Sequence, residues 1–181
     1  MVKNNLGFTL IELVAVIVLL GILAVTALAR FVNLSSDAHL AVFQSTFGAF
    51  KSGMNSANHV WITRGSPTGV NAINVNENLD YNNLGYPAGI DDGSQVSTPS
   101  DCLAIFENIL QTSLVAEVPV GDGAGIKNLA PSVDVAVTNN NNICYYTFVS
   151  ESKSIGYNAR QFRYLYTTGS IVEWPAGFTL N

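Results

Sequence analysis

Few residues in the sequence have the types and spacing that catalysis or metal binding requires. The two histidines, His39 and His59, lie twenty positions apart in a stretch with a helical pattern. Twenty residues turn a helix by about 200°, so the two imidazoles face different ways and do not share a metal ion. Serines and threonines are plentiful, but they fall in turns and neither histidine is placed to activate them. The sequence therefore predicts no enzyme, no cofactor and no metal centre.

Three aspartates, Asp91, Asp92 and Asp122, lie in glycine-containing loops and could offer oxygen ligands to calcium. Neither loop has the alternating acids of a recognised calcium loop, and aspartate is also a common turn residue. We interpret these aspartates as turn residues, with calcium binding as the open alternative.

A single carboxylate interrupts the most apolar part of the chain. Residues 8–28 carry one charged side chain, Glu12. As a helix this stretch is about 32 Å long, the thickness of a bilayer core. A charge near the centre of a membrane helix costs roughly 2.5–3.5 kcal/mol, so a retained charge usually has a partner or a task. Either Glu12 lies near the interface and favours the helix N-terminus through the dipole, or it serves such a task.

The residues around Glu12 resemble a known processing signal. A leader with Lys3 is followed by Gly7-Phe-Thr-Leu-Ile-Glu-Leu13, which is similar to the N-terminal signature of type IV pilins and pseudopilins. The resemblance implies that a prepilin peptidase cuts between Gly7 and Phe8 and methylates the new amine of Phe8. It also implies that Glu12 attracts the Phe8 amine of a neighbouring subunit during filament assembly. A secretory signal is cut after its apolar run, whereas this cut retains the anchor.

Length and composition indicate one globular head on one anchor. With 181 residues the chain is long enough for a single domain with a sizeable core. The expected divisions are a leader at 1–7, a transmembrane and filament-core half of a long helix at 8–30, and a head at 31–181 that includes the rest of that helix.

The charge distribution argues against nucleic acid as a partner. The formal net charge is −5, and removal of Lys3 with the leader leaves 7 basic against 13 acidic residues, or −6. The basic residues are scattered, whereas phosphate binding needs clustered lysine and arginine.

The two cysteines, Cys102 and Cys144, belong to a head that the resemblance places outside the cytoplasmic membrane. An even number of cysteines in an oxidising compartment predicts a disulfide. The loop-entropy model gives such a bridge about 4 kcal/mol of stabilisation. Two free buried thiols are the alternative.

Helical character continues beyond the apolar run. Six residues recur at spacings of three and four and so share one helix face: Phe43, Phe47, Phe50, Met54, Ala57 and Trp61. The sequence predicts one helix over about 8–62, with this stripe packed under a sheet. Many type IV pilins have a glycine and a proline eight residues apart in this helix. This chain has Gly21 but Ala29, so Gly21 is the expected point of flexibility. Ala29 supports the helix, and melting of the helix on assembly is left open.

The remaining sequence predicts an α+β head. Residues 63–98 are rich in turn formers and indicate a surface connection with at most short elements. A helix follows Thr98-Pro-Ser-Asp101, which offers a capping box and a proline at the first helical position. The sequence then predicts an antiparallel sheet of about four strands, with a hairpin turn at 139–142, a second hairpin over 161–174 and an edge strand at 114–120.

Resemblance and residues together predict a structural subunit of an extracellular type IV pilus used for surface attachment. Residues 31–38 further resemble the mannose-sensitive haemagglutinin (MSHA) group of pilins. The expected partners are copies of the same chain in a helical filament, the prepilin peptidase, the assembly machinery and, before assembly, the inner membrane. Two alternatives remain: a minor pilin or type II secretion pseudopilin at a filament tip, and a membrane-anchored carbohydrate-binding module.

Overall fold

The computed structural model describes residues 8–68, 79–90, 95–120, 124–153, 158–174 and 178–179, without the side chains of 28–33, 124, 158 and 178–179. By internal contacts the chain divides into two compact units, residues 1–40 and 41–181, which we describe separately. A long helix is followed by short strands, a second helix and a sheet, and the expected α+β fold is confirmed.

Helix α1 runs without interruption from Leu10 to Thr63, close to the predicted 8–62. It is helical through Gly21 and Ala29 in this single chain, and flexibility there stays a prediction. The helix ends just before Gly65, whose φ of 88° is accessible to glycine without a steric penalty. A positive φ at this place redirects the chain out of the helix.

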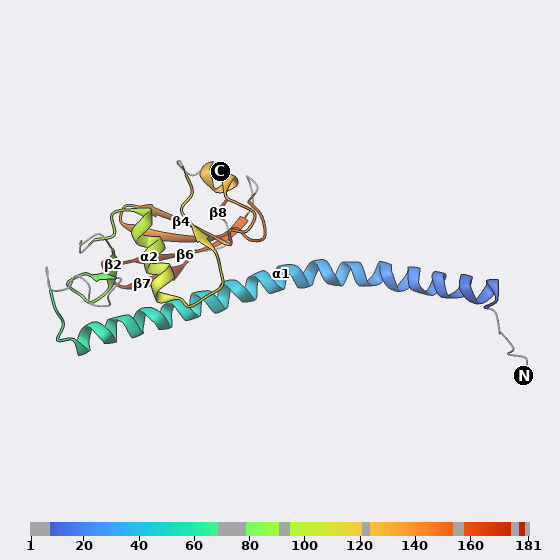
Figure 1. Cartoon of the computed structure of the whole chain (residues 1–181), viewed down its shortest axis with the longest axis horizontal. Helices are drawn as coiled ribbons and strands as arrows, with labels where there is room; N and C mark the ends of the chain where they lie inside the picture. Colours follow the sequence, from blue (N-terminus) through green and yellow to red (C-terminus); the bar gives the residue numbers. More distant parts are fainter. Residues whose placement is uncertain are drawn as a thin grey trace, which may run out of the picture. The chain divides into compact units, whose positions relative to one another are not determined.

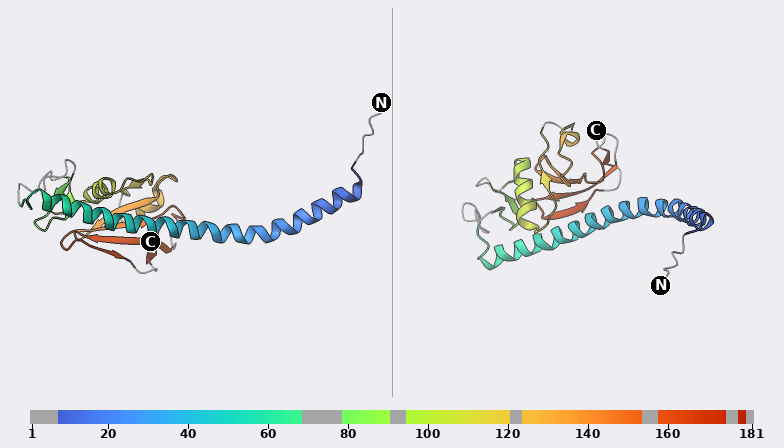
Figure 2. Two further views of the ribbon diagram at one scale, coloured as in Figure 1. Left: turned by 90° about the horizontal axis from the view of Figure 1, so that it is seen from below. Right: turned by 45° about the vertical axis from the view of Figure 1, so that its right-hand side comes forward.

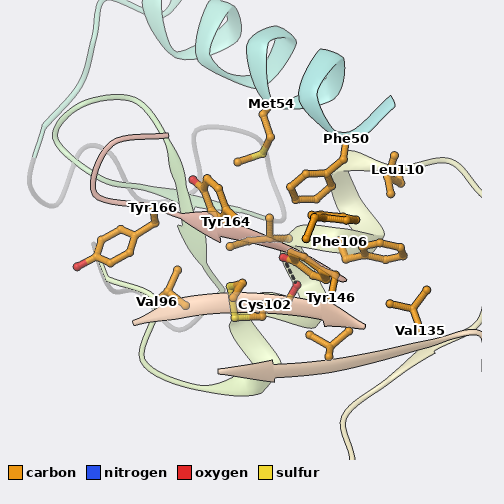
Figure 3. Packing of buried hydrophobic residues seen from close by; sticks show 14 of the residues in the cluster. Phe50, Met54, Val96, Cys102, Phe106, Leu110, Val135, Tyr146, Tyr164 and Tyr166 are labelled. Carbon is orange, nitrogen blue, oxygen red and sulfur yellow. Dashed lines mark hydrogen bonds between the residues drawn. A yellow bond between two sulfur atoms is a disulfide. The ribbon is translucent and has the colours of Figure 1, made fainter. Parts of the chain in front are cut away.

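The predicted stripe on α1 is confirmed as the centre of the core in the second unit. Phe43, Phe50, Met54 and Ala57 are buried, while Phe47 and Trp61 are partly buried against them. The Phe50 ring lies 5.2 Å, centroid to centroid, from the rings of both Tyr146 and Phe162. Figure 3 shows Phe50 reaching from the helix toward Phe106, and Met54 reaching toward Tyr164. Burial of each large side chain contributes about 1.5–3 kcal/mol.

The connection after α1 holds two short paired strands, β1 (Asp80–Tyr81) and β2 (Pro87–Gly89). Short elements were expected, but the prediction that this stretch lies on the surface is wrong for most of residues 79–89, which are buried. Leu79 and Tyr81 are fully buried and join the core. Asn82 is buried as well, and its amide donates to the Tyr166 carbonyl while its Oδ1 accepts from two backbone amides of the same turn. These bonds tie the turn to the core.

Helix α2 (Pro99–Ile109) begins as its sequence predicted. Thr98 is the N-cap, and its hydroxyl accepts from the Asp101 backbone amide at 3.2 Å. The buried Asp101 carboxylate accepts in return from the Thr98 amide at 2.7 Å and from the Thr98 hydroxyl at 2.9 Å. This capping box satisfies donors at the helix start that have no partner within the helix.

The main sheet has the order β3-β4-β5-β6-β7, with β8 also paired to β6. Its strands are β3 (Ala116–Glu117), β4 (Val135–Asn140), β5 (Ile143–Phe148), β6 (Asn158–Leu165), β7 (Ser170–Glu173) and β8 (Phe178–Thr179). β4 to β7 form the four-stranded antiparallel sheet that was predicted, and α2 lies beside it (Figure 1).

Two details of the sheet differ from the prediction. The edge strand expected at 114–120 has only two residues and pairs parallel to β4, because the Val115 carbonyl accepts from the backbone amides of Asp134 and Val135. The turn expected at 139–142 consists of Asn141 and Asn142 alone, with φ of 49° and 61°. Two successive positive φ values are typical of the tight hairpin turns that asparagine favours, so the flanking asparagines continue the strands.

The face of the sheet away from α1 has a covered half and an open half. The short helix η2 (Ala124–Asn128) lies over the covered half, as Figure 2 shows. A small apolar cluster fills this half: Ile126, Leu129, Val133, Ala136, Val149 and Ala159. The open half carries a cavity of about 320 Å³.

Candidate functional site

The first turn of α1 holds the carboxylate that the sequence singled out. The Glu12 Oε2 atom accepts from the Thr9 backbone amide at 2.9 Å and from the Thr9 hydroxyl at 2.7 Å. The Thr9 hydroxyl in turn accepts from the Glu12 backbone amide at 3.3 Å. These reciprocal bonds make a capping box with Thr9 as N-cap and Glu12 as the third helical residue. The helix starts at Leu10 because of this arrangement.

Sequence reasoning missed Thr9, although its signal was present. A Ser or Thr followed three residues later by Glu is the capping-box pattern, and Thr9-Leu-Ile-Glu12 has it. Because Glu12 lies in an apolar run, we considered a partner in a neighbouring subunit and not the hydroxyl of Thr9. In the single chain the hydrogen bonds of Glu12 are therefore local, to Thr9. The carboxylate also lies at the N-terminal end of the helix, where the helix dipole favours a negative charge.

The residue at the expected cleavage point is fully accessible. Phe8 directly precedes the capping box and is 78% exposed. Gly7 lies outside the described residues. The structure places Glu12 against Thr9 rather than against Phe8, so a role for Phe8 and Glu12 in assembly remains a proposal.

The helix that follows Glu12 is apolar on all sides and covered by nothing in its own unit. The window Leu10–Ala27 has a mean hydropathy of 2.8 and no buried residue. By length and composition this part of α1 is able to cross a membrane. Glu12 is the one charged residue in the window, which leaves its charge at the end of the span rather than at the centre.

The cysteines lie in the second unit, away from solvent. A disulfide joins Cys102 on α2 to Cys144 on β5, with 5.4 Å between the Cα atoms, and both residues are fully buried. The Tyr146 hydroxyl donates to the Cys102 carbonyl at 2.9 Å, a bond drawn in Figure 3. The bridge thus fixes α2 to the central strand of the sheet.

Buried tyrosines are the most perturbed titratable groups of this unit. Burial raises the pKa of Tyr81 to about 12, and it raises the pKa of both Tyr146 and Tyr164 well above 10. The hydroxyls of Tyr146 and Tyr164 donate to backbone carbonyls, the latter to Pro87 at 2.8 Å. Both hydroxyls lack access to solvent, so they stabilise the core and have no route to a substrate.

Metal-binding groups do not assemble in the part of the chain that the structure describes. There, no three side chains of His, Cys, Asp or Glu come together as a metal site would require. Asp91, Asp92 and Asp122 fall outside the described residues. The calcium alternative therefore stays open.

Comparison with known proteins bears on the N-terminus alone. No curated protein and no solved structure matches the chain significantly. One family model matches, and its description is Prokaryotic N-terminal methylation motif. The match covers residues 2–28, from within the leader to the end of the apolar run. Such a motif is typical of structural subunits, not of enzymes. It also implies processing by a prepilin peptidase. At its N-terminus, therefore, the chain carries the methylation motif of a type IV pilin-like prepilin.

Proposed function

We propose that this chain is a structural subunit of an extracellular type IV pilus that polymerises through the first part of α1. The observation that carries the proposal is the wholly exposed apolar helix Leu10–Ala27 inside the methylation motif. An apolar surface on all sides of a helix needs lipid or other apolar helices around it. The membrane surrounds this helix with lipid before assembly, and a filament built around such helices surrounds it with other apolar helices afterwards.

Processing creates the charge that Glu12 is proposed to meet. Hydrolysis of the Gly7–Phe8 bond leaves a new amine on Phe8, which the peptidase then methylates. An unpaired carboxylate and an unpaired ammonium are each costly in a filament core of low dielectric, and bringing them together removes most of that cost. Pairing of Glu12 with the Phe8 amine of a neighbouring subunit would set the register between the two chains.

The capping box defines what must change on assembly. Oε2 of Glu12 holds both bonds from Thr9 in the single chain. A carboxylate has about four acceptor positions, so an incoming ammonium does not need to displace Thr9. We infer that Thr9 holds the carboxylate in place while its remaining lone pairs receive the amine of the next subunit.

The location and the use of the filament follow from this assembly. The chain stays in the inner membrane through Leu10–Ala27 and is then drawn into an extracellular filament. Each subunit presents different surfaces to its neighbours, so the assembly is head-to-tail and open. Surface attachment and an assignment to the MSHA group rest on the sequence resemblance, and they stay predictions within this proposal.

Substitution of the carboxylate tests the proposal directly. Glu12→Ala removes the proposed ion pair, and we expect membrane insertion to be retained while the yield of sheared surface filaments falls at least about tenfold. A broken charge pair with a buried partner costs about 2–5 kcal/mol, which is enough for such a loss. Membrane fractionation and quantification of sheared filaments measure the two outcomes.

Thr9→Val is the matched control, because it weakens the capping box and leaves the carboxylate in place. We expect its filament yield to fall much less than that of Glu12→Ala. Normal filament yield from Glu12→Ala contradicts the pairing. Equal losses from both variants mean that the capping box limits assembly as strongly as the carboxylate does, through the helix start or through the position of the carboxylate.

The abundance of the chain separates a major subunit from a minor one. Mass spectrometry of sheared filaments should show this chain as the dominant species. Trace amounts would assign it instead to the minor pilins or pseudopilins at a filament tip.

A further inference from the structure

The open half of the outer sheet face has a cavity whose lining is polar and aromatic. The cavity measures about 320 Å³, near the lower limit for pockets that hold small ligands. Its lining residues are Thr138, Asn140, Tyr145, Gln161 and Trp174. Two aromatic rings, two amides and a hydroxyl make up this set, and it contains no acidic side chain.

Strand register brings these side chains to one face. Thr138 pairs with Tyr145 across β4 and β5, and Tyr145 pairs with Arg163 across β5 and β6. Directly paired residues point to the same side of a sheet, so the three form one row. Gln161 lies two positions from Arg163 on β6, and its carbonyl accepts from the Trp174 amide at 2.9 Å. The aromatic ring of Trp174 is thereby held beside the row.

Arg163 is not one of the lining residues, but it contacts Trp174, which is one of them. Its guanidinium carbon lies 4.6 Å from the centroid of the Trp174 ring, a cation–π contact. The Nε atom is buried without a hydrogen-bond partner among the described residues.

Arg160, unlike Arg163, has a carboxylate partner among the described residues. Arg160, three residues earlier on the same strand, donates to the Glu151 carboxylate at 2.9 Å. In the part of the chain described here, no carboxylate lies within ion-pairing distance of Arg163. A buried N–H donor without an acceptor is costly, so the Nε atom of Arg163 favours an anionic partner at this place.

We propose that this cavity binds a saccharide that carries a carboxylate, of the uronic-acid class. The carboxylate lies against the Arg163 guanidinium, where two parallel N–H donors fit two oxygens. The rings of Tyr145 and Trp174 offer apolar surface to the C–H groups of the pyranose. The amide of Asn140 is placed to exchange hydrogen bonds with sugar hydroxyls, whereas the buried Gln161 amide donates to the Thr147 hydroxyl and supports the floor of the cavity. This site is separate from the N-terminal helix and does not depend on the function proposed for it.

Calorimetric titration of the full chain in detergent micelles tests the site. The probes are D-galacturonate and D-glucuronate, with D-galactose and D-glucose as their uncharged counterparts and acetate as a carboxylate without a sugar ring. We expect the two uronates to bind with dissociation constants of about 1 mM or tighter. The neutral sugars and acetate should bind at least about tenfold more weakly, because each lacks one half of the recognised chemistry.

Two arginine variants locate the binding. Arg163→Gln should weaken uronate binding about tenfold or more, since a hydrogen bond to a charged group contributes about 1.5–3 kcal/mol. Arg160→Gln makes the same change of charge on the same strand, and we expect its affinity to stay within about twofold of the parent chain. Thermal melting of each variant verifies that the head is folded.

Several results would overturn the proposal. These are an absence of uronate binding, equal binding of the neutral sugars or of acetate, and equal losses from Arg163→Gln and Arg160→Gln. A fall in filament yield for Arg163→Gln without any uronate binding to the parent chain would also overturn it, because the face would then be a contact between subunits.

Discussion

The two ends of α1 place similar side chains in opposite surroundings. In the first part of the helix Leu10 is 82% exposed and Leu19 is 62% exposed, whereas Phe50 and Met54 near the other end are almost completely buried. The first part is apolar on every side, and the later part is apolar on one stripe only. A striped helix is completed by its own chain, while a helix that is apolar all round depends on lipid or on other chains. Stability should therefore depend on the later part and assembly on the first.

The largest contrast is expected from truncation of a core aromatic residue. Phe50→Ala should lower the free energy of unfolding of the head by about 3–5 kcal/mol, because it removes a fully buried ring and leaves a cavity. Leu19→Ala, at an exposed position of the same helix, should change it by no more than about 0.5 kcal/mol. Denaturant unfolding of the full chain in micelles measures both. Similar losses from the two variants would remove the distinction between the helix parts.

Removal of the disulfide should affect the head alone. The double variant Cys102→Ala/Cys144→Ala is expected to lose roughly 2–4 kcal/mol of unfolding free energy, because the unfolded chain regains the freedom of a long loop. Chemical denaturation followed by tryptophan fluorescence reports the head, since the first tryptophan is Trp61. Amide exchange in Leu10–Ala27 should be unchanged. Loss of protection there as well would show that the two regions unfold together.

Alkaline pH should also separate the two regions. Tyr81, Tyr146 and Tyr164 have a raised pKa in the folded head and a pKa near 10 when unfolded. Above about pH 10 the unfolded chain loses protons that the folded chain keeps, so the free energy of unfolding falls as pH rises. Each tyrosine contributes a fall of about 1.4 kcal/mol per pH unit, and for Tyr81 the window closes near pH 12.

Measurement of unfolding free energy across this pH range gives the slope. Tyr146→Phe should reduce that slope by about the contribution of one tyrosine, whatever its effect on stability at neutral pH. An unchanged slope would mean that the Tyr146 hydroxyl titrates normally in the folded head. The apolar stretch of α1 contains no tyrosine, so its helicity should persist as the head unfolds.

The smallest effect is expected at the start of α1. Thr9→Val breaks the capping box and should weaken the first turn by about 1 kcal/mol. Amide exchange at Ile11 to Leu13 should speed up accordingly. Thr26→Val is the control, because the Thr26 hydroxyl bonds only to carbonyls of its own helix. If the two variants fray the first turn equally, the capping box does not determine the start of the helix.

Local patterns were sufficient to predict much of this fold. The stripe from Phe43 to Trp61 and the capping box at Thr98 depend on residues close in sequence, and both form as their patterns indicated. The asparagine turn also has a local signal, although it is two residues shorter than predicted. The parallel pairing of β3 depends on a hydrogen bond between Val115 and Val135, which no local pattern specifies. The burial of Leu79 and Tyr81 likewise depends on distant partners.

The candidate sites divide in the same way. Glu12 was found from sequence because a charge in an apolar run is a local signal, and its bond to Thr9 had an equally local signal that was not used. The cavity near Arg163 had no local sequence signal. It depends on the register of three strands and on the place of Trp174, which come together only in the folded sheet.

The most direct measurement of the central claim is the N-terminus of the mature chain. Mass spectrometry of the protein from membranes and from sheared filaments should show a chain that begins at N-methylated Phe8 and retains the apolar stretch through Leu28. A mature chain that still begins at Met1, or one cut after the apolar run, would contradict the account, because the helix would then not pass from the membrane into a filament.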